Sequence, residues 1–195
     1  MDKRIVFGCI VVLTLFPISF AGAKQLSEQD GTVPVELWTK TFGGPGNDAA
    51  IDVIETAGGG YLLAGHTESF GAGSSDMWLV KTDSNGNEQW NKTFGGAGEE
   101  GASTVIETAG GGYLLAGYTK SFGAGSSDMW LVKTDSNGNE QWNATFGGTD
   151  KEEVNAMIET AGGGYLLAGR SNSFGMGGPD FWLVKTDSNG NEQWN

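Results

Sequence analysis

The feature that most constrains the fold of this chain is a repeat of 52 residues. Tryptophan recurs at this spacing, at Trp38, Trp90, Trp142 and Trp194. The tryptophans begin three units, residues 38–89, 90–141 and 142–193, and a fourth unit that starts at 194. The first two units are identical at 43 of 52 positions. A repeat of this length buries its apolar faces only against its neighbours, which predicts a stacked array rather than separate domains.

Each unit contains four short segments that are typical of β-strands. In the first unit they are residues 51–56, 61–67, 77–82 and 88–94, which are rich in β-branched and aromatic side chains. The Asn85-Gly86 pair predicts a tight hairpin turn with positive φ at both residues. Four-stranded meanders at this period predict an all-β, β-propeller-like fold. Three blades make an incomplete ring, because propellers close with about four to eight.

Four sequence blocks carry a resemblance to known proteins. They are Thr41 to Gly44, Gly59 to Tyr61, Ala64-Gly65 and Asp76 to Asp83. These blocks resemble the repeat of secreted archaeal and bacterial β-propeller proteins. The turn and strand from Asp83 to Trp90 are similar to the tryptophan-docking segment of quinoprotein-type propellers, which implies that an outer-strand tryptophan pins adjacent blades. The resemblance implies a fold and not an activity, because propellers host unrelated functions.

The N-terminal residues predict export. Lys3 and Arg4 precede an apolar stretch from Ile5 to Phe20, and the small residues Ala21 to Ala23 are typical of a cleavage site. The stretch is shorter than the roughly 20 residues that a membrane span needs. We therefore expect a secreted or cell-surface protein without membrane association after cleavage. The predicted organisation is a signal peptide at 1–23, a lead-in segment at 24–37 and the repeats at 38–195.

The composition excludes several classes of protein. With 24 acidic and 11 basic residues the net charge is −13, which disfavours binding to nucleic acid or to an anionic membrane surface. The 34 glycines exclude a helical bundle, because each glycine in a helix interior costs about 1 kcal/mol relative to alanine. Cys9, the single cysteine, lies within the predicted signal peptide, so the mature chain would contain no disulfide.

Carboxylates recur in the same columns of all three units, as at Glu55, Asp76 and Asp83 of the first. A residue that every blade repeats is best explained by a need of every blade. For Asp83 that need is a turn in which the carboxylate accepts backbone N–H groups. A catalytic acid and base need two different environments, which symmetric copies do not provide. We favour a non-enzymatic protein, and a secreted glycosidase-like enzyme that uses the variable loops is the alternative.

Metal and cofactor binding receive little support. Residues 83–87 place oxygen-bearing side chains at alternate positions, as a calcium loop does, but Glu88 stands where that loop requires glycine. An ordinary Asn-Gly turn is favoured over a calcium site. No cofactor is predicted, because the mature chain lacks cysteine and its single histidine, His66, is replaced by Tyr118 and Arg170 in the same column.

The columns that differ between units are the informative ones. They are concentrated before the first strand and after the second, and these two connections of an antiparallel meander emerge at the same edge of the sheet. We predict that this face binds a glycan, a cell-envelope component or another protein, and the alternative is that exposed loops tolerate change. The candidate contacts are His66, Glu68, Tyr118, Lys120, Arg170, Asn172, Asp48, Glu99, Glu100, Glu152 and Glu153.

Two further expectations concern modification and assembly. Asn91 and Asn143 begin acceptor triplets for N-glycosylation on the predicted outer strand. Three units and a leading strand at residues 36–42 cannot close a ring, so blade faces at both ends are predicted to be exposed. Either the chain begins a longer protein or two copies complete a six-bladed ring, and its end in mid-strand at Trp194-Asn195 favours the longer protein. The sequence thus predicts an exported module for binding or cell-surface structure.

Overall fold

The computed structural model describes residues 23–26 and 35–195 and divides the chain into two compact units, Met1–Lys40 and Thr41–Asn195. In the first unit, β1 (Ala23–Leu26) and β2 (Val35–Trp38) form an antiparallel pair. Most of the predicted signal peptide, residues 1–22, lies outside the described residues. The leading strand predicted at residues 36–42 ends at Trp38, so the prediction was wrong for residues 39–42.

The second unit consists of three four-stranded antiparallel sheets, in each of which the strands follow chain order. The first sheet contains β3 (Asp48–Glu55), β4 (Tyr61–Thr67), β5 (Asp76–Thr82) and β6 (Glu88–Phe94). The second contains β7 (Glu100–Glu107), β8 (Tyr113–Thr119), β9 (Asp128–Thr134) and β10 (Glu140–Phe146). The third contains β11 (Glu152–Glu159), β12 (Tyr165–Ser171), β13 (Asp180–Thr186) and β14 (Glu192–Trp194). No helix occurs among the described residues.

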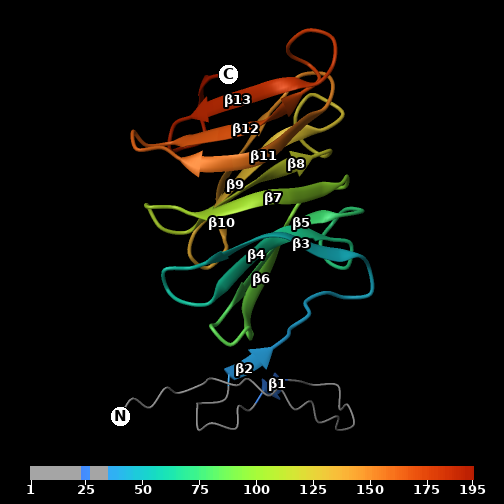
Figure 1. The fold of residues 1–195 in the computed structure, drawn as a ribbon. Coiled ribbons are helices and arrows are strands. Elements are labelled where there is room, and N and C mark those ends of the chain that lie inside the picture. Colours follow the sequence, from blue (N-terminus) through green and yellow to red (C-terminus); the bar gives the residue numbers. More distant parts are fainter. Residues whose placement is uncertain (1–22, 27–34) are drawn as a thin grey trace, which may run out of the picture. The chain divides into compact units, whose positions relative to one another are not determined.

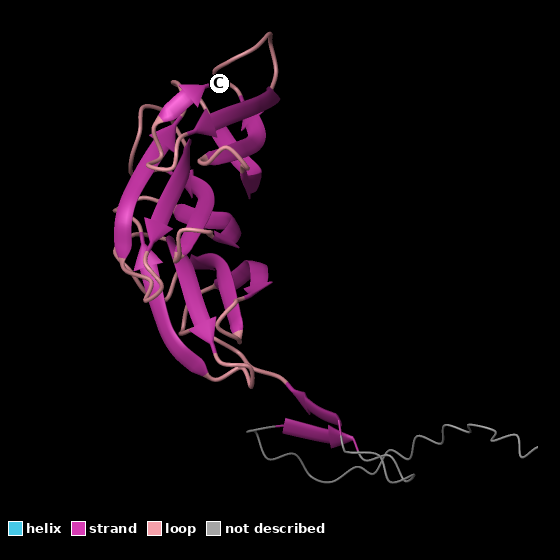
Figure 2. Cartoon of the chain, turned by 90° about the vertical axis from the view of Figure 1, so that its left-hand side faces the viewer, coloured by secondary structure: helices cyan, strands magenta, loops and turns pink. Residues whose placement is uncertain are grey.

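The predicted fold class is confirmed. The fold is all-β, the sheets repeat every 52 residues or so, and they form an open arc that does not close into a ring (Figures 1 and 2). The first strands β3, β7 and β11 lie next to one another and are called the inner strands. The fourth strands β6, β10 and β14 are the opposite edges of the sheets. This is the arrangement of part of a β-propeller.

The first strand of each sheet begins earlier than its β-branched residues indicate. β3 starts at Asp48 rather than Ile51, and the register shifts by one residue between Ala50 and Asp52. The shift is a β-bulge that leaves Ile51 without a partner on β4. Ser103 and Asn155 occupy the same position in β7 and β11. On each inner strand the bulge therefore leaves one residue of a variable column without a cross-strand partner.

The turn between the third and fourth strands differs from the predicted hairpin. Among the described residues, positive φ occurs only at glycine, so Gly86 has a φ of 72° and Asn85 does not adopt the predicted conformation. The Asp83 carboxylate accepts hydrogen bonds from the N–H groups of Asn85 and Asn87, both at 2.8 Å. This confirms the predicted role of Asp83 and explains the turn, because the carboxylate holds a longer loop that ends in one left-handed glycine.

The hydrophobic core lies between the sheets. The face that each sheet turns toward the next sheet in the chain is its forward face, and the opposite face is its backward face. The forward face of the first sheet carries Leu62, Met77 and Leu79, which pack against Val105 and Leu115 on the backward face of the second. A second cluster repeats this packing between the second and third sheets. Every unit carries nearly the same forward face and nearly the same backward face, so each sheet can pack on the next and one sequence unit can be used three times.

Tryptophans of the outer strands add a second contact between sheets. The Trp90 ring lies against Gly138 in the turn of the second sheet, so close that a Cβ on Gly138 would come 2.7 Å from the ring. Its centroid is 6.1 Å from that of Tyr113. Trp142 makes the equivalent contacts with Gly190 and Tyr165. The fourth strands β6 and β10 therefore each hold the turn of the following sheet.

Candidate functional site

The two variable segments of each unit meet, as the antiparallel pairing predicts. Asp48 lies opposite Thr67, and the Glu68 N–H donates to the Asn47 carbonyl at 2.8 Å. The corresponding bonds in the second and third sheets join Lys120 to Glu99 and Asn172 to Lys151. The variable residues therefore gather at one end of the inner strands, on a scaffold that is otherwise nearly constant.

Variable residues also face one another across the first and second strands. The cross-strand partners are Ala49 with His66, Gly101 with Tyr118 and Glu153 with Arg170. Tyr118 covers the space above Gly101, where a Cβ would come 3.0 Å from its ring. The Arg170 Nε donates to Glu153 at 2.7 Å. Each large side chain of the second strand thus has a small or oppositely charged partner.

The remaining candidates at this end are exposed and paired. Lys120 forms an ion pair with Glu99. Glu68 accepts a hydrogen bond from the Asn47 side-chain amide at 2.8 Å. Pairs of this kind on the surface contribute little to stability, about 0–1 kcal/mol, so their side chains are available to a ligand.

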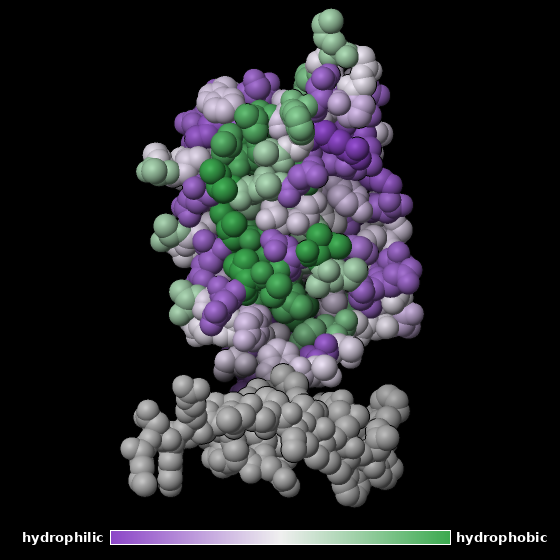
Figure 3. Space-filling model, in the orientation of Figure 1, coloured by the Kyte–Doolittle hydropathy of each residue, from purple (hydrophilic) through white to green (hydrophobic). Residues whose placement is uncertain are grey.

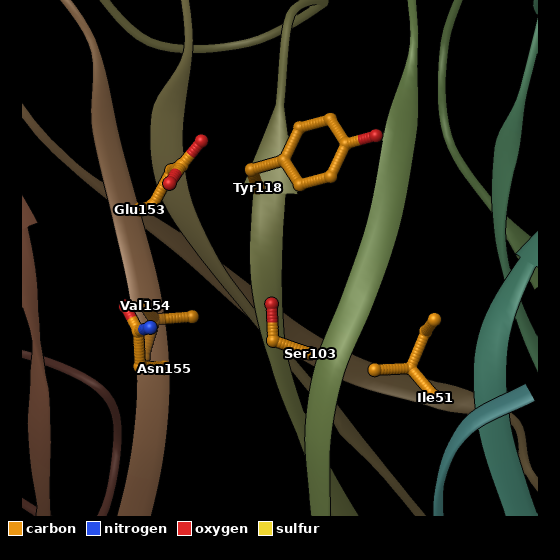
Figure 4. Close-up of a pocket in the computed structure, with 6 residues that line it drawn as sticks. All are labelled: Ile51, Ser103, Tyr118, Glu153, Val154 and Asn155. Carbon is orange, nitrogen blue, oxygen red and sulfur yellow. The ribbon is translucent and has the colours of Figure 1, made fainter.

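A hollow of about 390 Å³ lies among the inner strands. Three sheets contribute to its walls: Ile51 from β3, Ser103 from β7 and Asn155 from β11 are the three bulge residues (Figure 4). Tyr118 of β8 and Glu153 and Val154 of β11 complete the lining. A space-filling view shows an apolar band along the three sheets (Figure 3). Among the inner-strand residues, Ile51, Val53 and Ile158 are exposed.

The hollow combines an aromatic ring, polar groups and an ion-paired carboxylate. Burial, reinforced by the charge of Glu99, raises the pKa of Tyr118, so its hydroxyl stays protonated at neutral pH. Burial alone would raise the pKa of Glu153, but hydrogen bonds and charges from Lys151 and Arg170 outweigh it and lower the pKa. Glu153 is therefore ionised, and it forms ion pairs with two cations, Lys151 and Arg170.

Three of the predicted contacts form one buried or half-buried column with a different task. Glu100 is fully buried and accepts hydrogen bonds from the N–H groups of Gly96, Lys120 and Ser121 and from the Thr119 hydroxyl. Glu152 is equally buried and accepts the corresponding bonds in the third sheet. The Asp48 carboxylate, half-buried, accepts bonds from Thr67, Ser69 and Gly44. These carboxylates hold the loops beside the inner strands.

This column predicts a loss of stability in acid. Burial raises the pKa of Asp48, but its hydrogen bonds outweigh burial and lower the pKa to about 2. The same balance lowers the pKa of Glu100 and Glu152. Because the folded-state pKa values lie below the unfolded ones, the stability from these groups is present above about pH 5 and is lost as the pH falls toward 2.

The acid effect is measured best as a difference between two proteins. Acidification also relieves repulsion in a chain of net charge −13, which acts in the opposite direction. The difference in unfolding free energy between the wild type and Glu100→Gln, from urea titrations at pH 7 and pH 3.5, cancels most of that repulsion. We expect this difference to shrink at pH 3.5, and a constant or larger difference would contradict the assigned role.

The repeated carboxylates are engaged in structure as well. Asp76 is buried and accepts the N–H groups of Ala72 and Gly73, each at 3.0 Å. Glu107 reaches back to the preceding sheet and accepts the Ala57 N–H at 2.8 Å. Within the described part of the chain, no group of three or more His, Cys, Asp or Glu side chains is placed to hold a metal ion.

The two predicted glycosylation sites lie on the outer strands. Asn91 on β6 and Asn143 on β10 are exposed. Their amides donate to Glu88 and Glu140, each at 2.7 Å. Both asparagines are distant in the sheet order from the inner strands, so a glycan there would leave the hollow open.

Sequence reasoning missed four residues of the hollow, Ile51, Ser103, Val154 and Asn155. A signal was present, because Ile51, Ser103 and Asn155 share one column and differ in all three units. The pattern did not reveal that a bulge turns this column toward a common space, since a bulge arises from pairing and not from composition.

Comparison with known proteins adds no family or activity. No family model matches the chain, and no protein of curated function matches it. None of the described residues belongs to a helix long and apolar enough to cross a membrane.

Proposed function

We propose that this protein is an exported, non-enzymatic β-propeller-type binding module that takes a neutral, hydroxyl-rich ligand such as a glycan in the inner-strand hollow. The observation that carries the proposal is the position of the variable columns. Ile51, Ser103 and Asn155 differ between nearly identical units and line one space together with Tyr118. The N-terminal sequence supports export, which would bring the module to the cell surface or the medium.

The chemistry of the hollow favours a sugar over a charged ligand. The flat face of Tyr118 offers an apolar surface for the C–H face of a sugar ring. Ser103 and Asn155 supply donors and acceptors for hydroxyl groups. Glu153, which forms ion pairs with Lys151 and Arg170, adds carboxylate oxygens that accept hydrogen bonds. The lining mixes the apolar side chains of Ile51 and Val154 with these polar groups, and a few converging polar groups fix the orientation of a bound small ligand.

A glycosidase-like enzyme is the less favoured alternative. Such an enzyme uses two carboxylates about 5–10 Å apart, one of them protonated at working pH. Glu153 is the one carboxylate among the six lining residues, and its lowered pKa is the opposite of what a general acid needs. The neighbouring Glu152 is buried under its own hydrogen bonds.

The proposal predicts that removal of the Tyr118 ring abolishes most of the binding. Isothermal titration calorimetry of the full chain would use three probes: neutral gluco-oligosaccharides, N-acetylated amino-sugar oligosaccharides and acidic oligosaccharides. We expect a neutral probe to bind and Tyr118→Ala to weaken it at least tenfold, because the ring supplies the apolar contact. Asn155→Ala should weaken it less, since it removes one polar partner.

The matched control is Asn137→Ala, in the exposed turn between β9 and β10. It deletes the same amide as Asn155→Ala but lies far from the hollow in the sheet order, so the affinity should stay within twofold of the wild type. Failure of all three probes to bind, or binding that survives Tyr118→Ala, would overturn the proposal.

A further inference from the structure

The forward face of the third sheet is apolar and uncovered. Phe181 is 103% exposed, whereas the residues at the same position in the first two sheets, Met77 and Met129, are 0% exposed. Leu183 and Ile158 are exposed beside it, although their counterparts in the first two sheets are buried or half-buried. A contiguous apolar face of this kind marks a site of association.

The backward face of the first sheet is the complementary surface. Val53 is 58% exposed, whereas Val105 and Met157, at the same position in the next two sheets, are 1% and 6% exposed. Leu63 is half-buried, while Leu115 is fully buried by the first sheet. Each end of the arc therefore exposes one half of an interface that the chain already forms twice internally.

The polar groups of the two free faces also match. Between the first two sheets, Glu107 accepts the Ala57 N–H, the Glu100 N–H donates to the Ser75 carbonyl, and the Ser74 N–H donates to the Gly98 carbonyl. The third sheet keeps the Ala161 N–H, the Pro179 carbonyl and the Gly178 N–H at these places. The first sheet keeps the Glu55 carboxylate, the Asp48 N–H and the Gly46 carbonyl.

The substitutions in the third sheet preserve this pattern. Pro179 replaces a serine whose carbonyl accepts in the internal contact, and proline retains its carbonyl. Gly178 replaces a serine whose N–H donates, and glycine retains that group. A Cβ on Gly177 or Gly178 would meet nothing within 4 Å, whereas one on Gly73 would collide with the following sheet at Gly98. The loop therefore retains the backbone groups that the internal contact uses and leaves open the space that a neighbouring sheet fills there.

We propose that two copies of this chain associate head to tail, the forward face of each third sheet on the backward face of the other first sheet. Both contacts between the two copies repeat the internal contact between neighbouring sheets. A contact between two different surfaces closes into a ring when the rotation from one subunit to the next adds up to a full turn. Six sheets fall within the range of about four to eight found in closed propellers. A second copy is the occupant because its free faces carry, at the same positions, the apolar side chains and hydrogen-bonding groups that the internal interfaces use.

Sedimentation equilibrium of the full chain tests the assembly. We expect a particle of twice the chain mass, and two single variants that each restore the monomer. Phe181→Asp changes the forward face of the third sheet, and Val53→Asp changes the backward face of the first. Both side chains are exposed in the single chain, so circular dichroism should be unchanged. Gln141→Asp, on the exposed outer strand β10 of the middle sheet, is the matched control and should stay dimeric.

Mixing the two variants identifies the mode of contact. Phe181→Asp and Val53→Asp chains retain one intact pair of faces between them, so the mixture should form a dimer although each alone is a monomer. A symmetric contact between two third sheets predicts instead that Val53→Asp stays dimeric. Wild-type protein that is a monomer or larger than two copies, a dimeric Val53→Asp variant or a monomeric mixture would each overturn the proposal.

Discussion

Replacement of Glu100 by alanine is expected to lower the free energy of unfolding by about 3 kcal/mol or more. The carboxylate is fully buried and accepts four hydrogen bonds, from the N–H groups of Gly96, Lys120 and Ser121 and from Thr119. Each donor left unsatisfied in a buried place costs about 1–3 kcal/mol. Water can reach part of the vacated space, so the costs do not add in full.

Urea titration followed by tryptophan fluorescence measures this effect. The matched control is Glu99→Ala, one residue earlier, which removes an exposed carboxylate paired with Lys120 and should cost less than about 1 kcal/mol. Glu100→Gln should lie between the two, because an amide keeps one acceptor oxygen but loses the charge. Equal losses for Glu99→Ala and Glu100→Ala would show that Glu100 does not hold the loops.

The second, third and fourth strands could be predicted from the sequence almost to the residue. Their turns carry glycine and Asp-Ser-Asn-Gly segments, and their apolar runs have the length of strands, so local chemistry alone defines them. The second strand predicted at residues 61–67 is β4, and the fourth predicted at 88–94 is β6. Repetition strengthens such predictions, because each unit is an independent sample of one pattern.

The first strand and the Asn-Gly turn were predicted less well, because distant or side-chain hydrogen bonds determine them. Asp48 belongs to β3 since its carboxylate bonds to Thr67 and Ser69 of the neighbouring strand and loop. Asn85 keeps a negative φ since Asp83 captures the N–H groups of the turn. Strand and turn propensities are preferences of single residues and take no account of these hydrogen bonds.

The candidate site was predicted in outline. The variable columns meet at one end of the sheets, as the antiparallel meander predicts, and two of the predicted contacts, Tyr118 and Glu153, line the hollow. The sequence could not separate Glu100 from Glu99, because neighbouring carboxylates differ only in the direction in which the pleat points them. One is buried under four hydrogen bonds and the other is exposed in an ion pair.

Substitution of Gly117 by alanine is the other change with a large expected effect, a loss of about 3 kcal/mol of unfolding free energy. Of the 34 glycines, 27 occupy nine columns that are glycine in every unit, and Gly117 belongs to a column in the middle of a strand. Its partner is Ala102, beside the bulge. A Cβ would come 1.9 Å from the Gly101 carbonyl oxygen, and Gly65 and Gly169 are equally close to the strand beside them.

The added Cβ would collide with backbone, so only a movement of β7 away from β8 or the loss of the bulge could relieve the collision. Overpacking of this kind lowers the unfolding free energy by about 1–3 kcal/mol or more. Gly110→Ala is the matched control, because a Cβ there meets nothing within 4 Å, and its stability should stay within about 0.5 kcal/mol of the wild type. Removal of the bulge would also turn Ser103 away from the hollow. Gly117→Ala should therefore weaken ligand binding and stability together, whereas a variant as stable as Gly110→Ala would show that the bulge does not depend on this glycine.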